Sequence, residues 1–145
     1  MPIKVDIRKV EVILSGTFGV HAFKNWGENA VSVNVEALEE MLYNEKLGAN
    51  GDMLLSKSYK PDNKLVRLNV LPKSADYFFM QKLVALEESG AQDVFVCTIK
   101  DSLNNESWIS TSCVLKNAPK VEFGDNIAGD IEYQILMPAA VHIVE

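Results

Sequence analysis

Two histidines and two cysteines are the side chains of this sequence best suited to metal binding or nucleophilic chemistry. Neither His21 nor His142 has a second histidine at i+2 or i+4, or a neighbouring cysteine, to complete a zinc site. We therefore expect both to be packing or partly exposed histidines. Cys97 and Cys113 have no CxxC or Cys/His spacing and lie in strand-like segments, which predicts buried free thiols of a reducing compartment. We expect no metal site and no cofactor.

Carboxylates and hydroxyls offer acid–base or nucleophilic chemistry at a few other positions. The pairs at 39–40 and 87–88 are both Glu-Glu, but such pairs usually form the solvated face of an amphipathic helix. The hydroxyls of residues 110–112 have no nearby general base. Residues 101–106 have the composition of a calcium loop without its residue order, so a hairpin turn is expected. The GxSxG, HExxH, P-loop and GxGxxG patterns do not occur, and we expect no enzymatic activity.

Length and charge limit the kinds of protein that the sequence can encode. Its 145 residues fit one domain spanning residues 1–145, large enough for a single core. The net charge of −6 argues against a protein that binds nucleic acid tightly. A negative surface would instead repel the phosphates, so that nucleic acid could pass along it without binding. The first residues lack the apolar stretch of a signal peptide, and no run approaches the roughly 18 apolar residues of a membrane span. We expect a soluble protein made in the cytoplasm, with no membrane contact.

Alternating apolar and polar residues predict a mainly β protein. The pattern is clearest in residues 131–136, whose odd-numbered members are Ile, Tyr and Ile. One helix is expected over residues 77–88, with Ser74 as its N-cap and Gly90 at its end. The further strands are expected at residues 3–14 (changing face at 8–9), 17–23, 31–35, 65–71, 94–99 (central and buried), 108–115 and 141–144. About eight strands and one flanking helix indicate a β-sandwich or small barrel.

A long segment between two expected strands, residues 36–61, is the least regular part of the chain. Residues 36–47 are good helix formers with Leu38, Met41 and Leu42 as apolar positions, and Gly48 could cap a short helix there. The alternative is that all of residues 36–61 form one long excursion between strands. An excursion of this length in a compact domain is usually functional.

The two tryptophans allow different interpretations. Trp108 lies within an expected strand, which favours a place in the core. Trp26 lies in an expected turn beside Gly27, where an exposed contact and simple packing both remain open.

Three segments, taken in order, resemble the tail tube proteins of contractile-tailed bacteriophages. Residues 47–76 are similar to that family's Gly-rich loop, Ser/Lys stretch, strand and capped helix, here LGANGDMLLSKSYKPDNKLVRLNVLPKSAD. Residues 95–119 resemble its strand, "KD" hairpin, return strand and turn to proline, here FVCTIKDSLNNESWISTSCVLKNAP. Residues 121–135 resemble its closing turn and strand, here VEFGDNIAGDIEYQI. In that family the loop before the Gly-rich turn is usually polar and extended, whereas residues 36–47 here favour a helix.

The resemblance implies a virion structural protein. Such subunits form hexameric rings that stack into the inner tail tube, through which DNA leaves the capsid into the host. The implied partners are further copies of the chain, the tail sheath, the tape measure, and the baseplate and tail terminator proteins. DNA would pass the lumen without specific binding, and the tail would be assembled in the host cytoplasm.

By analogy with that family, the long loop contacts neighbouring subunits and rings. The residues expected at this interface are Met41, Leu42, Tyr43, Gly48, Gly51, Met53, Leu54, Tyr59 and Trp26. Two alternatives remain open: the tube of a type VI secretion system or tailocin, and a monomeric β-barrel binding module.

Overall fold

Over the described residues the fold is mainly β, with one helix, as predicted. A computed structural model describes residues 9–24, 26, 32–38, 43–57, 63–90, 94–121 and 129–144. The elements in chain order are β1 (Val10–Gly16), β2 (Gly19–Ala22), β3 (Val33–Ala37), β4 (Tyr43–Leu47), β5 (Met53–Lys57), β6 (Lys64–Val70), α1 (Ala75–Glu88), β7 (Phe95–Asp101), β8 (Glu106–Leu115), β9 (Ile131–Met137) and β10 (Val141–Val144). The strand expected in residues 3–8 lies outside the described residues.

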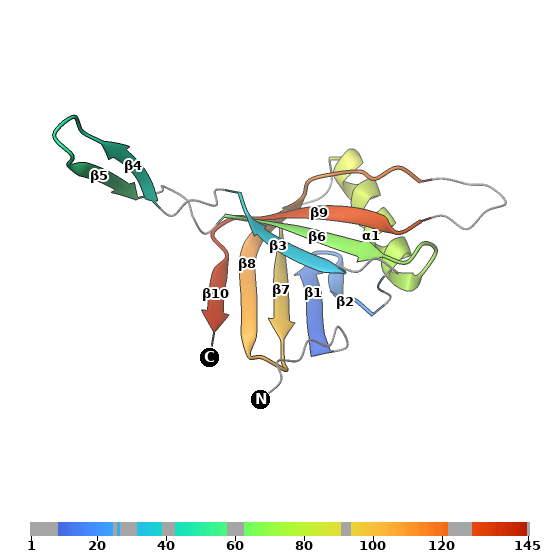
Figure 1. Cartoon of the computed structure of the whole chain (residues 1–145). Helices are drawn as coiled ribbons and strands as arrows, with labels where there is room; N and C mark the ends of the chain where they lie inside the picture. The colour runs from blue at the N-terminus through green and yellow to red at the C-terminus, as the bar shows by residue number, and fades with distance from the viewer. Residues whose placement is uncertain are drawn as a thin grey trace.

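One antiparallel sheet folds over on itself to make two layers. Its strand order is β2-β1-β7-β8-β9-β6-β3, and β10 also pairs with β8. The long strand β8 makes the turn between layers, because its residues 106–113 pair with β7, and 106–109 also with β10, while Val114 and Leu115 pair with β9. Strands β9, β6 and β3 therefore run crosswise over β10, β8, β7 and β1 (Figure 1).

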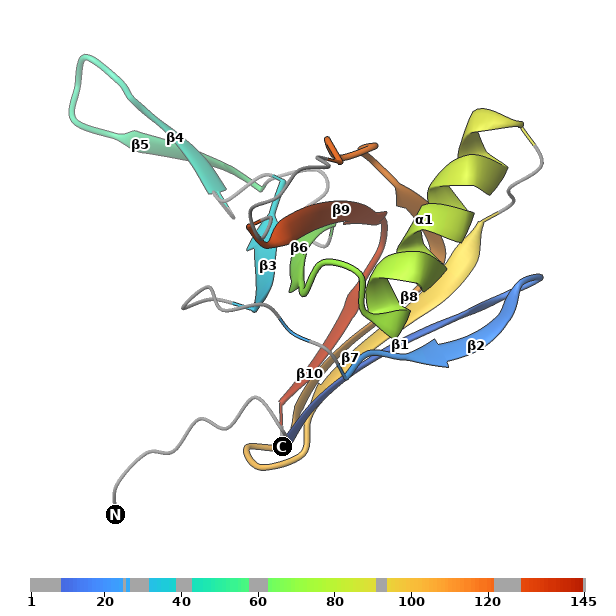
Figure 2. The same ribbon diagram turned by 90° about the vertical axis from the view of Figure 1, so that its right-hand side faces the viewer.

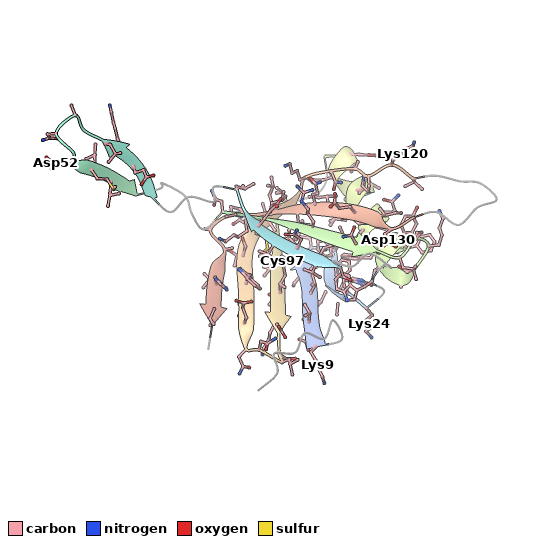
Figure 3. All side chains as sticks on the ribbon, viewed as in Figure 1. Lys9, Lys24, Asp52, Cys97, Lys120 and Asp130 are labelled. Atoms are coloured by element: carbon pink, nitrogen blue, oxygen red, sulfur yellow. The ribbon has the colours of Figure 1, made fainter. Side chains whose placement is uncertain are left out.

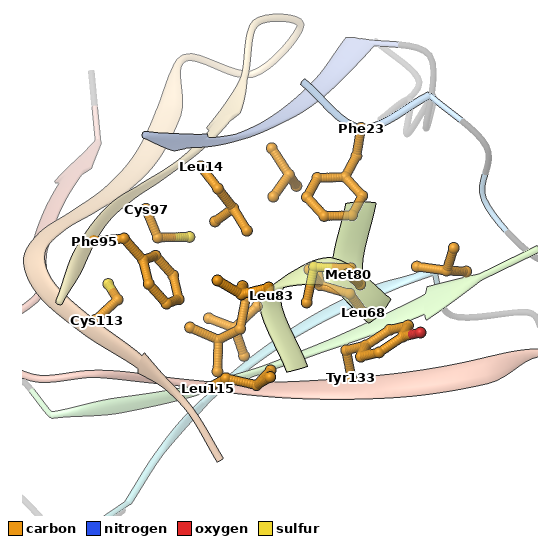
Figure 4. Packing of buried hydrophobic residues seen from close by; sticks show 14 of the residues in the cluster. Leu14, Phe23, Leu68, Met80, Leu83, Phe95, Cys97, Cys113, Leu115 and Tyr133 are labelled. Atoms are coloured by element: carbon orange, nitrogen blue, oxygen red, sulfur yellow. The ribbon is translucent and has the colours of Figure 1, made fainter. Parts of the chain in front are cut away.

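The core lies between these two layers and α1. Alternation directs one side of each strand inward, so Val12 and Leu14 of β1 meet Tyr133 and Ile135 of β9 in one buried cluster. The helix lies along the open side of the fold (Figure 2) and adds Tyr77, Met80, Leu83 and Val84 to the same core (Figure 4). Ser74 accepts a hydrogen bond from the backbone N–H of Tyr77, which confirms it as the N-cap.

Both cysteines are buried and free, as predicted. Cys97 lies on β7, which is central in the sheet, although only Phe95, Cys97 and Ile99 of that strand are fully buried. Residues 94–99 are expected from the sequence to be buried on both faces of the sheet. Only the face that carries Phe95, Cys97 and Ile99 is fully buried. The hydrogen bond between the two thiols, together with burial, raises the pKa of Cys97 well above its ordinary value.

The segment 36–47 is not the predicted helix. β3 continues to Ala37, and residues 43–47 form β4, which pairs with β5. The helix propensity of this segment is a weak local preference, and antiparallel pairing with residues 53–57 overrides it. Residues 39–42 lie outside the described part of the chain. The other interpretation, one long excursion between strands, stays a prediction; the described part of this segment contains the β4–β5 hairpin.

Tyr133 offers a test of the core. Its side chain is fully buried, its hydroxyl donates to Oε1 of Gln81 at 3.1 Å, and burial raises its pKa. Tyr133→Phe should lower the free energy of unfolding by about 1 kcal/mol, the net value of one hydrogen bond. Because the folded-state pKa lies above the unfolded value of about 10, this tyrosine opposes folding only as the pH rises past about 10. Urea unfolding at pH 7 and pH 11 should show a smaller alkaline loss of stability in the Phe variant, and equal losses in both proteins would contradict this role.

Candidate assembly surface

The β4–β5 hairpin is built by the short sequence that joins its strands. The backbone N–H of Gly48 donates to the carbonyl of Asp52 at 2.7 Å, and that of Gly51 donates to the carbonyl of Gly48 at 3.1 Å. The Asn50 side chain bonds both the backbone N–H and the carboxylate of Asp52. Gly51 has φ +89°, which an L side chain adopts only with strain. All of these contacts are made within the turn, so the turn sequence favours the hairpin locally.

The register of the hairpin gathers apolar side chains on one face. Leu47 pairs with Met53 and Glu45 pairs with Leu55, and cross-strand partners point to the same side. Leu47, Met53 and Leu55 are 68%, 55% and 58% exposed. We call these three residues and Glu45 the apolar face of the hairpin. Lys46 and Leu54 form a cross-strand pair on the opposite face.

The hairpin stands clear of the folded body. In the described part of the chain, β4 and β5 pair only with each other, and residues 45–55 are all exposed. Figure 1 shows the hairpin projecting from one end of the molecule, and Figure 3 shows its side chains, with Asp52 at the tip, away from the core. An isolated two-stranded hairpin is marginally stable in water. Its exposed apolar surface makes the hairpin the candidate site of contact with another molecule.

Five of the nine residues expected at an interface lie on this hairpin. They are Tyr43, Gly48, Gly51, Met53 and Leu54. Met41, Leu42 and Tyr59 lie outside the described residues. Sequence reasoning missed Leu47 and Leu55, which only the pairing register places beside Met53.

Trp26 lies elsewhere, on the body of the protein. It is half-buried, forms an isolated bridge with Val70 and stacks on Phe23 at a ring distance of 5.8 Å. These contacts favour the packing interpretation, and an interface role for Trp26 stays a prediction.

His21 takes part in a buried polar cluster that joins β2 to α1. Its Nε2 lies 2.8 Å from Oδ1 of Asp76, a residue only 2% exposed, and its ring stacks on Phe79 at 4.1 Å. The backbone N–H of Lys24 donates to the other carboxylate oxygen of Asp76 at 2.8 Å. The prediction of a packing histidine is confirmed for His21. The role of Asp76 could not be found from the sequence, because both partners lie more than 50 residues away in the chain.

The second histidine is held on the edge strand β10. His142 stacks on Trp108 at 4.5 Å, and its Nε2 lies 3.0 Å from a carboxylate oxygen of Glu106. Trp108 is half-buried and packs against the core, so the prediction that it lies in the core is confirmed in part.

Among the described residues, no three or more His, Cys, Asp or Glu side chains gather where a metal ion could bind. Of the described segments, none is a helix with the length and apolar character needed to span a bilayer.

Comparison with known proteins adds one finding about the fold. No protein-family model and no curated protein matches the chain. Among solved structures, the chain is similar to one described as the sheath/tube terminator, in its extended state, of an extracellular contractile injection system, PVC. The TM-score is 0.54 at 10% identity, and the match covers 99% of each chain. At this identity the similarity shows a shared fold over the whole length.

Proposed function

We propose that this chain is a structural subunit that assembles into rings of the tube of a contractile injection device. The main support for the proposal is that the apolar face of the β4–β5 hairpin is exposed to solvent in the isolated chain. The resemblance of three segments to phage tail tube proteins supports it. The fold shared with a contractile injection system component, at full coverage, also supports it.

Open sheet edges give a second reason for self-assembly. Within the described residues, β2, β3 and β10 each pair with a neighbour along one side only. All four side chains of β10 are exposed, among them Val141 at 57%. Unpaired edges with exposed apolar residues promote association, and closure of a ring removes them.

The more specific proposal is the inner tail tube of a phage. Hexameric rings would stack inside a sheath, with the tape measure protein in the lumen before DNA passes. The net charge of −6 suits a lumen from which DNA must be released, because like charge opposes binding. We propose no catalytic activity for this subunit.

A second candidate is the end ring that terminates such a tube. The description of the similar structure as a sheath/tube terminator favours it.

Negative-stain electron microscopy of the purified protein separates the two candidates. Hollow tubes of variable length are expected for the tube subunit, and single rings for the end ring. A monomer at the highest attainable concentration would contradict both.

The turn glycine gives a mutational test. Gly51→Ala should strain the hairpin by about 1–2 kcal/mol, because its positive φ disfavours any Cβ. Thermal unfolding of the body should stay unchanged while assembly weakens. Gly129→Ala is the matched control, since its Cβ would meet nothing within 4 Å and its φ is not positive. Equal assembly of both variants would argue against a role for the hairpin.

A further inference from the structure

The outward side of α1 carries a second exposed apolar surface. Phe78 is 53% exposed, and Lys82 and Leu86 follow it at intervals of four residues, which places all three on one helix face. We call these residues the α1 stripe. The opposite side of the helix is buried in the core. The helix is thus anchored firmly while the stripe remains available to another molecule.

The stripe matches the apolar face of the hairpin in spacing. Four residues of helix rise about 6 Å, so Lys82 lies about 6 Å along the axis from Phe78. Two residues of a strand rise about 6.7 Å, which separates Glu45 from Leu47 by nearly the same length. Each surface therefore presents an apolar side chain and then a charge at the same interval.

The two surfaces also match in charge. Glu45 is the acidic residue of the hairpin's apolar face and pairs across the strands with Leu55. Lys82 lies between the apolar residues of the stripe, and both charged side chains are exposed. An acid among apolar residues on one surface is thus complementary to a base among apolar residues on the other.

We infer that the hairpin of one copy packs on the α1 stripe of the next copy, with Glu45 pairing with Lys82. This inference rests on the proposed function and names the partner of its hairpin. The hairpin and α1 lie at opposite ends of the subunit (Figure 1). A contact between different surfaces of identical subunits is head-to-tail, and such contacts generate rings or helical filaments.

Charge reversal tests the pairing directly. Glu45→Lys alone and Lys82→Glu alone each place like charges together, which should raise the protein concentration needed for assembly at least about tenfold. The double variant restores opposite charges and should assemble as the unmodified protein does. An equimolar mixture of the two single variants should also assemble, because each hairpin then meets an oppositely charged helix on the other variant.

The controls are Lys46→Glu, on the opposite hairpin face, and Glu88→Lys, which is exposed on α1 outside the stripe. Both should assemble normally, and circular dichroism should show every variant to be folded. Normal assembly of both single variants would overturn the inference while leaving the proposed function intact. Failure of the mixture would likewise overturn it, because the pair would then not join different copies. An unmodified protein that never assembles would overturn both.

Discussion

Deletion of residues 48–53 will abolish assembly and leave a folded monomer. The deletion removes the turn and Met53, so β4 and β5 lose the connection that holds Leu47 and Leu55 on one face. Complete burial of one such side chain is worth about 1.5–3 kcal/mol. The loss of several should therefore exceed the tenfold change in association that about 1.4 kcal/mol produces.

The body should survive this deletion because none of the removed residues belongs to the core. Thermal unfolding should therefore match that of the unmodified chain, while sedimentation shows only monomer.

Two point variants compare an exposed leucine of the hairpin with an exposed leucine elsewhere. Leu47→Ser should weaken assembly, whereas Leu103→Ser, at an exposed leucine in the β7–β8 turn, should not. Normal rings or tubes from the deletion variant would refute an assembly role for the hairpin.

Asp76→Ala should cause the largest loss of stability. The carboxylate is buried, accepts one hydrogen bond from the backbone N–H of Lys24 and lies 2.8 Å from His21 Nε2. Its removal leaves both partners without this acceptor and detaches β2 from the start of α1. Hydrogen bonds to a charged group are worth about 1.5–3 kcal/mol each, so the loss of two should lower the free energy of unfolding by about 3–6 kcal/mol.

Urea unfolding at pH 7 would measure this loss. Asp76→Asn keeps a side-chain oxygen for Lys24 and should lose less than the Ala variant. Glu88→Ala, at an exposed residue of the last turn of the same helix, should change stability by no more than about 0.5 kcal/mol. An Asp76→Ala variant as stable as the unmodified protein would show that the buried cluster contributes nothing.

The regular strands and the helix of the body could be predicted because their signals are local. In β9, apolar residues at every second position identify the buried face, and Tyr133 is fully buried as that period requires. Ser74 likewise marks the start of α1 through a hydrogen bond within its own first turn. In these elements the local preference and the tertiary packing agree.

The hairpin and the buried cluster could not be predicted in the same way. Residues 43–47 favour a helix locally, and Gly48, which the sequence suggested as a helix C-cap, instead bonds Asp52 in the hairpin turn. The composition of the assembly surface depends on a register that pairs Leu47 with Met53. The contact of Asp76 with His21 joins residues 55 positions apart. Such contacts depend on the folded arrangement, which periodicity does not reveal.

Hydrogen–deuterium exchange of the hairpin, measured in the monomer and in the assembled protein, tests the central claim most directly. Free in solution, the backbone amides of β4 and β5 should exchange rapidly, because every described side chain over residues 45–55 is exposed. On assembly, a neighbouring copy should cover the hairpin and slow this exchange at least about tenfold, as burial in a stable contact requires. If assembly leaves the exchange of the hairpin unchanged, another surface joins the copies and the account is wrong.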